Sequence, residues 1–138
     1  MQHSDDENNS SSIEEYPGQA VAVAAELFFL LNLVFLPVIG FIILSGLYLR
    51  YKNHAVPLAR CHVRQAFIAS LWSWVMLVFV NVLILFFGGY DSPAVWVIVI
   101  LYLASFHTAF IMFGTFALTR AMNGRHYHYP LIGWKCSG

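Results

Sequence analysis

The chain has 138 residues, of which 59% are hydrophobic and 17% aromatic, while only 10% are charged and the formal net charge is zero. Soluble domains carry about a quarter of charged residues, so this composition excludes a soluble core with an adequate polar surface. The neutral balance also gives no basis for nucleic-acid binding. We therefore expect an all-α integral membrane protein.

The N-terminal segment 1–17 is polar and rich in Ser, Asn and acidic residues. Such a segment buries too little apolar surface to offset the entropy of ordering, so we expect a disordered acidic tail. It has neither a basic n-region nor an apolar h-region, so we expect no signal peptide. Residues 18–138 are then one membrane domain.

The first apolar run extends from Gly18 to Leu49, which is longer than one straight span requires. We expect a helical start at 18–26 and a transmembrane helix at 27–49, kinked near Pro37 because proline removes a backbone hydrogen bond. A helical hairpin broken at Pro37 is the disfavoured alternative. It would put Glu26 and Arg50 on one side, and its arms would be too short to cross.

The rest of the chain predicts two more spans, 66–87 and 94–118, joined by a tight hairpin at 88–93. A transmembrane helix needs about 20 apolar residues, and both segments provide them. The basic stretch 50–65, with a proline at position 57, is expected to lie along the membrane surface. The C-terminal tail is 119–138.

The charges are separated along the chain. The seven basic residues all lie between the first and second runs or after the third, at Arg50, Lys52, Arg60, Arg64, Arg120, Arg125 and Lys135. Basic loops stay on the cytoplasmic side, so the pattern predicts an outside N-terminus and a cytoplasmic C-terminus in the cell inner (plasma) membrane, with three passes. The two cysteines, Cys61 and Cys136, then face the cytoplasm and are expected to be free thiols.

Polar residues inside a bilayer are costly and need partners. Asn32 and Asn81 fall at similar distances from the outer ends of their spans, so we expect a hydrogen bond between them. His107 lies halfway along the third span, on a face of small and hydroxylated residues. A neutral packing histidine is favoured there, with a proton relay or quinone contact and haem ligation as alternatives. Glu26 is expected to reach water.

Basic and aromatic side chains gather at the predicted cytoplasmic rim. The members expected to contact anionic phospholipid or a partner are Arg60, His62, Arg64, Gln65, Arg120, Arg125, Tyr127, Tyr129 and Trp134. The nearby Cys61, His62, His126, His128 and Cys136 lack the short paired spacings of zinc sites. We expect no metal, no cofactor and no enzymatic activity, since catalytic motifs are missing from the sequence.

Two motifs resemble those of a known family. The segment His62-Val63-Arg64-Gln65-Ala66-Phe67 resembles H-x-R-Q-A-L-N-F, which begins the second helix in a widespread family of small bacterial membrane proteins of unknown function. That family is distantly related to the inner-envelope import (TIC) component of chloroplasts. The tail from Ala121 to Leu131 resembles the family's A-x-x-G-x-x-Y-x-Y-P-L ending.

The similarity covers roughly residues 25–132, and the chain departs from the pattern at Ile68, where the family has an Asn-Phe pair. The resemblance implies a multi-pass scaffold without established chemistry. Within the tail, Gly124 is expected to end a helix, and Pro130 to fix a turn that returns Tyr127 and Tyr129 to the membrane interface. His62, Arg64 and Gln65 are at a depth where they could meet this tail.

Two functions follow as hypotheses. The first is a non-catalytic accessory or assembly subunit that packs against and stabilises a larger membrane protein complex. Its contact faces would use aromatic residues, namely Phe28, Phe29, Phe35, Trp72, Trp74, Phe79, Phe86 and Trp96. The alternative is a small transport or channel component with a polar path through Asn32, Asn81 and His107.

Overall fold

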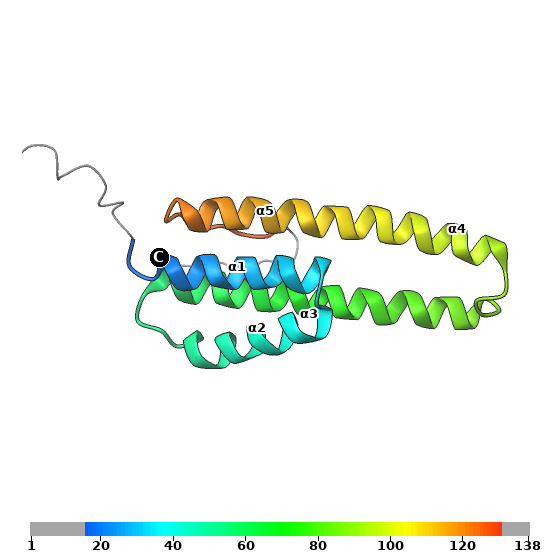
Figure 1. The fold of residues 1–138 in the computed structure, drawn as a ribbon, viewed down its shortest axis with the longest axis horizontal. Coiled ribbons are helices and arrows are strands. Elements are labelled where there is room, and N and C mark those ends of the chain that lie inside the picture. The colour runs from blue at the N-terminus through cyan, green and yellow to red at the C-terminus, as the bar shows by residue number, and fades with distance from the viewer. Residues whose placement is uncertain (1–15, 131–138) are drawn as a thin grey trace, which may run out of the picture.

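The computed structural model describes residues 16–130, and every regular element within them is helical. In chain order these are α1 (Gln19–Val34), α2 (Pro37–Tyr51), α3 (Pro57–Phe86), α4 (Pro93–Tyr102), the π-helix η1 (Leu103–His107) and α5 (Thr108–Met122). The last three form one continuous helical run of 30 residues. This run and α3 lie side by side and set the length of the molecule (Figure 1).

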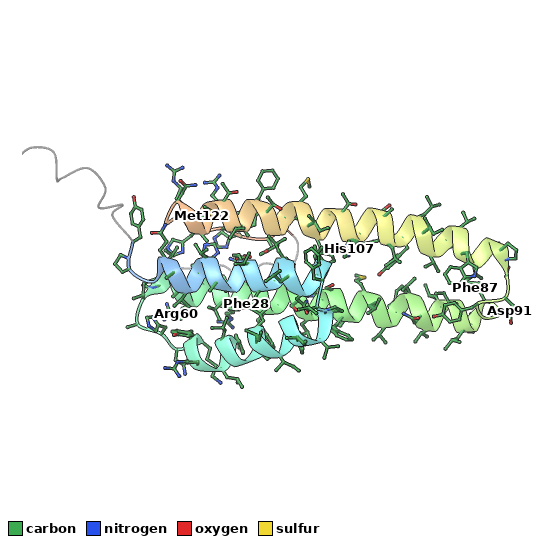
Figure 2. The ribbon with its side chains drawn as sticks, in the orientation of Figure 1. Phe28, Arg60, Phe87, Asp91, His107 and Met122 are labelled. Carbon is green, nitrogen blue, oxygen red and sulfur yellow. The ribbon has the colours of Figure 1, made fainter. Side chains whose placement is uncertain are left out.

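Two helices, α3 and the run Pro93–Met122, are each long and apolar enough to cross a membrane. They cover residues 66–86 and 94–118 of the two predicted spans, and that these helices cross a membrane stays a prediction. Arg60 and Met122 lie at one end of this pair, whereas Phe87 and Asp91 lie at the other (Figure 2). We call these the basic end and the loop end.

The prediction of one helix across 27–49 is wrong. The chain forms a helical hairpin instead, in which α1 and α2 pack against each other and against the first half of α3. Figure 1 shows that α1 begins and α2 ends at the basic end, and that the turn between them lies about halfway along α3. At 1.5 Å per residue the arms are only about 24 Å long, so the hairpin enters the bundle without crossing it.

The break between the arms follows from the sequence around Pro37. The residue before a proline is driven out of the helical region, and Leu36 has φ −134° and ψ 69°. Pro37 then occupies the first turn of α2, where its missing N–H is not needed. Gly40 completes the hairpin, because a Cβ there would lie 2.7 Å from the Cα of Asn32. The arms can approach this closely only at a glycine.

The hairpin also brings the start of α1 to the basic end. A Cβ built on Gly18 would lie 2.9 Å from the Cβ of Ala59 near the start of α3. The Gln19 side chain donates to the carbonyl of Met122 at the end of α5. The prediction that the chain enters from the side opposite the 50–65 loop is therefore wrong. Residues 1–15, including most of the expected acidic tail, lie outside the described residues.

The loop between the second and third helices is shorter than expected. We predicted a surface segment over 50–65, but α3 already begins at Pro57, which occupies its first turn. A proline that breaks a helix in its interior is well tolerated at that first position. As a result His62 and Gln65 project from the first turns of a helix, three residues apart and therefore on one face.

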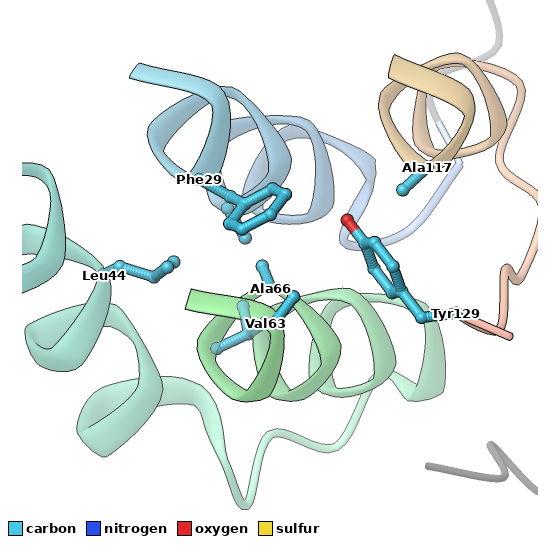
Figure 3. Packing of buried hydrophobic residues seen from close by; sticks show 8 residues of the cluster. Phe29, Leu44, Val63, Ala66, Ala117 and Tyr129 are labelled. Atoms are coloured by element: carbon cyan, nitrogen blue, oxygen red, sulfur yellow. The ribbon is translucent and has the colours of Figure 1, made fainter. Parts of the chain in front are cut away.

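The packed core lies in the half of the molecule that contains the hairpin. It joins residues from α1, α2, α3, α5 and the segment after α5, namely Ala25, Phe29, Leu44, Val63, Ala66, Ala69, Ala117 and Tyr129. Figure 3 shows Phe29 and Tyr129 directed into the space between the helices. Four of the eight members are alanines, which allow helix backbones to approach closely without a large side chain between them.

The half toward the loop end is thinner, because α1 and α2 do not extend into it (Figure 1). Its buried cluster contains only Val80, Ile84, Val95 and Val99, with Tyr102 packed against them. Most large apolar side chains of this half are exposed, including Phe86 at 82%. The hairpin thus divides the molecule into a four-helix half and a two-helix half.

Candidate functional site

A buried polar cluster lies in the four-helix half, between α1, α3 and the extended segment that follows α5. Its members are Glu26, His62, Gln65 and Tyr129, each at most 3% exposed. Polar groups buried this deeply are stable only when they are hydrogen-bonded. Each of the four has such partners within the described residues.

Each oxygen of the Glu26 carboxyl group has its own hydrogen-bond partner. His62 Nδ1 lies 2.8 Å from one carboxyl oxygen, and the Tyr129 hydroxyl donates to the other across 2.9 Å. The prediction that Glu26 reaches water is wrong, since its side chain is 0% exposed. Counting from a single straight span placed this residue at a membrane surface, whereas the hairpin places it inside the bundle.

His62 connects Glu26 to the C-terminal segment through its two ring nitrogens. Its Nε2 lies 3.0 Å from the carbonyl oxygen of Arg125, which only accepts, so Nε2 carries a proton. One further proton lies between Nδ1 and the carboxyl group. The pair is therefore either imidazolium with carboxylate or imidazole with carboxylic acid, and it has no net charge in either case. A neutral pair is the arrangement that tolerates burial.

Gln65 holds the same segment one helical turn further along α3. Its amide nitrogen donates to the carbonyl of Tyr127, and its amide oxygen accepts from the backbone N–H of Tyr129 across 2.9 Å. The backbone groups held by His62 and Gln65 belong to residues 125, 127 and 129, which alternate along the extended chain. Alternate residues of an extended chain face the same way, so one helix face can hold all three.

The segment can reach α3 because α5 ends at Met122 and the chain turns at Gly124. Gly124 has φ 62°, its N–H donates to Ala121, and the N–H of Arg125 donates to the carbonyl of Arg120. This pair of bonds is the Schellman ending that favours glycine. The predicted helix end at Gly124 is confirmed. The chain then folds back along the bundle.

Tyr129 was expected at the membrane interface, and that prediction is wrong. Its ring is 3% exposed and packs edge to face on Phe29 with ring centres 6.0 Å apart. Burial raises the pKa of the Tyr129 hydroxyl well above its ordinary value, with the nearby Glu26 as a further cause. The hydroxyl therefore stays protonated and remains a donor to Glu26. Tyr127 is half-buried beside it.

The other residues predicted at the rim have different surroundings. Arg60, Arg120 and Arg125 are exposed at the basic end, while Arg64 is half-buried. Trp134 lies outside the described residues, so its predicted role stays a prediction. The expected contact of the helix face with the tail is confirmed for His62 and Gln65.

Cys61 was predicted to be a free thiol, but it is disulfide-bonded. The other cysteine of the sequence is Cys136, which lies outside the described residues. The prediction of free thiols rested on a reducing compartment, where disulfides are rare. In the structure, the start of α3 lies against the chain that returns from α5.

The intramembrane polar residues are not arranged as predicted. Asn32 donates to the Ser70 hydroxyl across 2.9 Å, and Asn81 bonds to the carbonyl of Leu77 and the hydroxyl of Tyr90. The expected bond between the two asparagines is therefore not formed, because α1 turns back at mid-height. Asn32 and His107 line one pocket, and Asn81 does not line it. The transport alternative stays a prediction.

Comparison with known proteins places the chain in a family. The model of the magnetosome magnetite crystal formation protein family matches residues 18–136. The chain belongs to this family. No curated protein and no solved structure matches it.

The match to the magnetosome family extends over all four helical segments, the buried cluster and the segment after α5. The resemblance to a family of small bacterial membrane proteins is thus confirmed at that level. The suggested link to the chloroplast import component stays a prediction. The two long apolar helices and the family assignment are both consistent with a membrane protein.

Sequence reasoning selected His62, Gln65 and Tyr129 as site residues, although it placed Tyr129 at the membrane interface, and it missed Glu26. A carboxylate at position 26 within an apolar run is itself a signal, because such a group needs a buried partner if the run enters the membrane. The matching donors were present in the motifs at 62–65 and 127–130. Only the hairpin brings these three stretches together.

Proposed function

We propose that this protein is a non-catalytic accessory subunit located in the membrane in which magnetite crystals form. There it would pack against a larger membrane protein assembly and stabilise it. The family assignment supports the setting, and the exposed apolar surface of the two-helix half supports the role.

The exposed surface of the two-helix half is the observation that carries this proposal. Of the aromatic residues expected to make contacts, Phe29 is fully buried within the chain, whereas Phe79 and Trp96 are about half exposed. Lipid alone could cover single aliphatic side chains. Aromatic side chains carry much of the contact energy at protein interfaces. Those of the two-helix half that are not used in packing its helices together are therefore available to a partner.

The buried cluster supports a structural role more than a chemical one. Its carboxyl group, imidazole and amide are all occupied by partners within the chain. It fastens the C-terminal segment to α1 and α3, and so fixes the four-helix half as a rigid base. The two-helix half then projects from this base as a fixed surface for a partner.

The basic end is proposed to face the cytoplasm and to bind anionic phospholipid. Arg60, Arg120 and Arg125 are exposed there, and a cation near an anionic membrane surface contributes about 1 kcal/mol. The Cys61 disulfide, in contrast, is more typical of an oxidising compartment. Native mass spectrometry of the Arg60→Ala/Arg125→Ala variant should show weaker retention of phosphatidylglycerol. Unchanged retention would contradict the lipid role.

Site-specific photo-crosslinking in native membranes tests the accessory role. A benzophenone amino acid at Phe79, which is 54% exposed, should give discrete adducts with other membrane proteins. The same probe at Phe29, which is 0% exposed, serves as the control and should react within the chain. Adducts at position 79 with only lipid or further copies of this chain would overturn the proposal.

A further inference from the structure

A positively charged surface lies at the basic end. Its exposed side chains include Arg60 near the start of α3, Arg120 in the last turn of α5 and Arg125 shortly after that helix. None of these three arginines forms a salt bridge with another residue of the described range 16–130. Their charge is therefore available to an anion from elsewhere.

The acidic residues of the chain are placed unevenly. Only two of the seven, Glu26 and Asp91, fall within residues 16–130. Glu26 is fully buried with His62, and Asp91 lies at the loop end (Figure 2). The other five precede Tyr16 and are Asp5, Asp6, Glu7, Glu14 and Glu15. The carboxylates of this chain that could balance the basic end are therefore concentrated in the segment 1–15.

The described part of the chain begins beside the exposed arginines. The backbone N–H of Tyr16 donates to the Gln19 side chain across 2.9 Å, and the Gln19 amide nitrogen donates to the carbonyl of Met122. The Tyr16 ring lies against Gly124, where an added Cβ would overlap it. Tyr16 is thus held against the turn of chain that joins two of the three arginines.

The segment 1–15 is long enough to cover the basic end. Consecutive Cα atoms are about 3.8 Å apart, so Glu14 and Glu15 lie close to the point where Tyr16 is held. The acidic group at 5–7 is 9 to 11 residues from Tyr16. A flexible chain of that length spans about 15–20 Å. A helix with its side chains is about 10–12 Å wide, so this distance reaches across the ends of neighbouring helices.

We propose that the segment 1–15 binds the exposed arginines of the basic end and competes there with anionic phospholipid. Carboxylate and phosphate oxygens both make charge-assisted, bidentate contacts with a guanidinium group, so the two occupants use one surface. Attachment to the same chain gives the segment an effective concentration of about millimolar, which favours it over a free competitor. The docking does not require lipid binding, whereas the competition rests on the lipid role proposed above.

Carbodiimide crosslinking tests the docking. The full-length protein is reconstituted in nanodiscs of phosphatidylcholine, which has no net charge. Arg60→Lys and Arg125→Lys keep the positive charge and supply an amine that carbodiimide joins directly to a contacting carboxylate. Mass spectrometry should then find amide links from these positions to a carboxylate of the segment 1–15. Mixing isotopically labelled and unlabelled protein separates links within one chain from links between copies.

Asp91→Lys is the matched control, because it supplies an exposed amine at the loop end. It should give no link to the segment 1–15. The absence of within-chain links at both arginine positions, or equal links at position 91, would overturn the proposal. These links form in a neutral lipid, so their outcome is independent of whether the arginines bind anionic phospholipid.

Native mass spectrometry tests the competition. The segment is neutralised by five substitutions, Asp5→Asn, Asp6→Asn, Glu7→Gln, Glu14→Gln and Glu15→Gln. Retention of phosphatidylglycerol should rise roughly two- to fivefold, as expected for the loss of an exposed ion pair. The same substitutions should have a smaller effect in the Arg60→Ala/Arg125→Ala background, because two of the three arginines are gone. An equal gain in both backgrounds, or no gain in either, would show that the segment does not compete for this surface.

Discussion

Replacing Gln65 with leucine should release the C-terminal segment from α3. Leucine is an apolar side chain of similar size, so the change removes the hydrogen bonds from the Gln65 amide to the segment with little loss of packing. It leaves the N–H of Tyr129 and the carbonyl of Tyr127 without partners. Each unpaired buried group costs about 1–3 kcal/mol, and the half-buried carbonyl is at the lower end, so the total is about 2–4 kcal/mol.

Trypsin provides a direct assay, because Arg125 lies within the segment that Gln65 holds. Cleavage after Arg125 requires local opening of the segment, and its rate then follows the population of the open state. A loss of about 2–4 kcal/mol corresponds to roughly 30- to 1,000-fold faster cleavage. The full increase is seen when opening the wild-type segment costs at least that much free energy. Mass spectrometry of the fragments separates this site from the other basic residues.

The matched control is Thr115→Val, which removes an exposed hydroxyl that bonds only to the carbonyl of Ile111 in its own helix. It should leave cleavage after Arg125 unchanged. If Gln65→Leu is cleaved at the rate of the Thr115→Val protein, the bonds from Gln65 do not hold the segment.

Three further predictions concern the pair, the hairpin and the topology. Glu26→Leu and His62→Leu should each destabilise the protein by about 3–5 kcal/mol, because each leaves a buried partner unpaired. In detergent unfolding, the double variant should lose less stability than the sum of the two single losses. Additive losses would show that the pair is not coupled. Gly40→Ala should lower the unfolding temperature, because overpacking at this position costs about 1–3 kcal/mol of stability. The control Gly46→Ala, with nothing within 4 Å of the added methyl, should be neutral or stabilising. Equal effects of the two changes would argue against a close approach at Gly40. Topology reporters fused before the first residue and after the last should respond on the same side, opposite to one inserted beside Asp91, and reporters on opposite sides would rule out the hairpin.

The sequence by itself determined the two long helices of this protein. The low content of charged residues and the two apolar stretches fixed α3 and the run Pro93–Met122, since these depend on local composition and length alone. The separation of Asp91 from the basic residues also follows directly from the sequence. Gly124 could be predicted as a helix end because its conformational freedom is a local property.

The hairpin could not be predicted in the same way. Pro37 permits either a kinked helix or a complete reversal, and the local sequence does not distinguish them. From the sequence the reversal is disfavoured, because it puts Glu26 and Arg50 on one side and makes each arm too short to cross a bilayer. In the folded protein that carboxyl group has its own partners, so the charge argument against a hairpin no longer applies. Those partners are His62 and Tyr129, which lie 36 and 103 positions further along the chain.

Tertiary structure alone decided which polar groups meet. Once α1 turns back at mid-height, Asn32 lies against Ser70, His107 joins the same pocket, and Asn81 is left to bond near the loop end. Composition and periodicity report how each segment interacts with water or lipid. They do not report contacts between segments, because these depend on a chain reversal whose free energy is decided by long-range packing at Gly40 and the buried cluster.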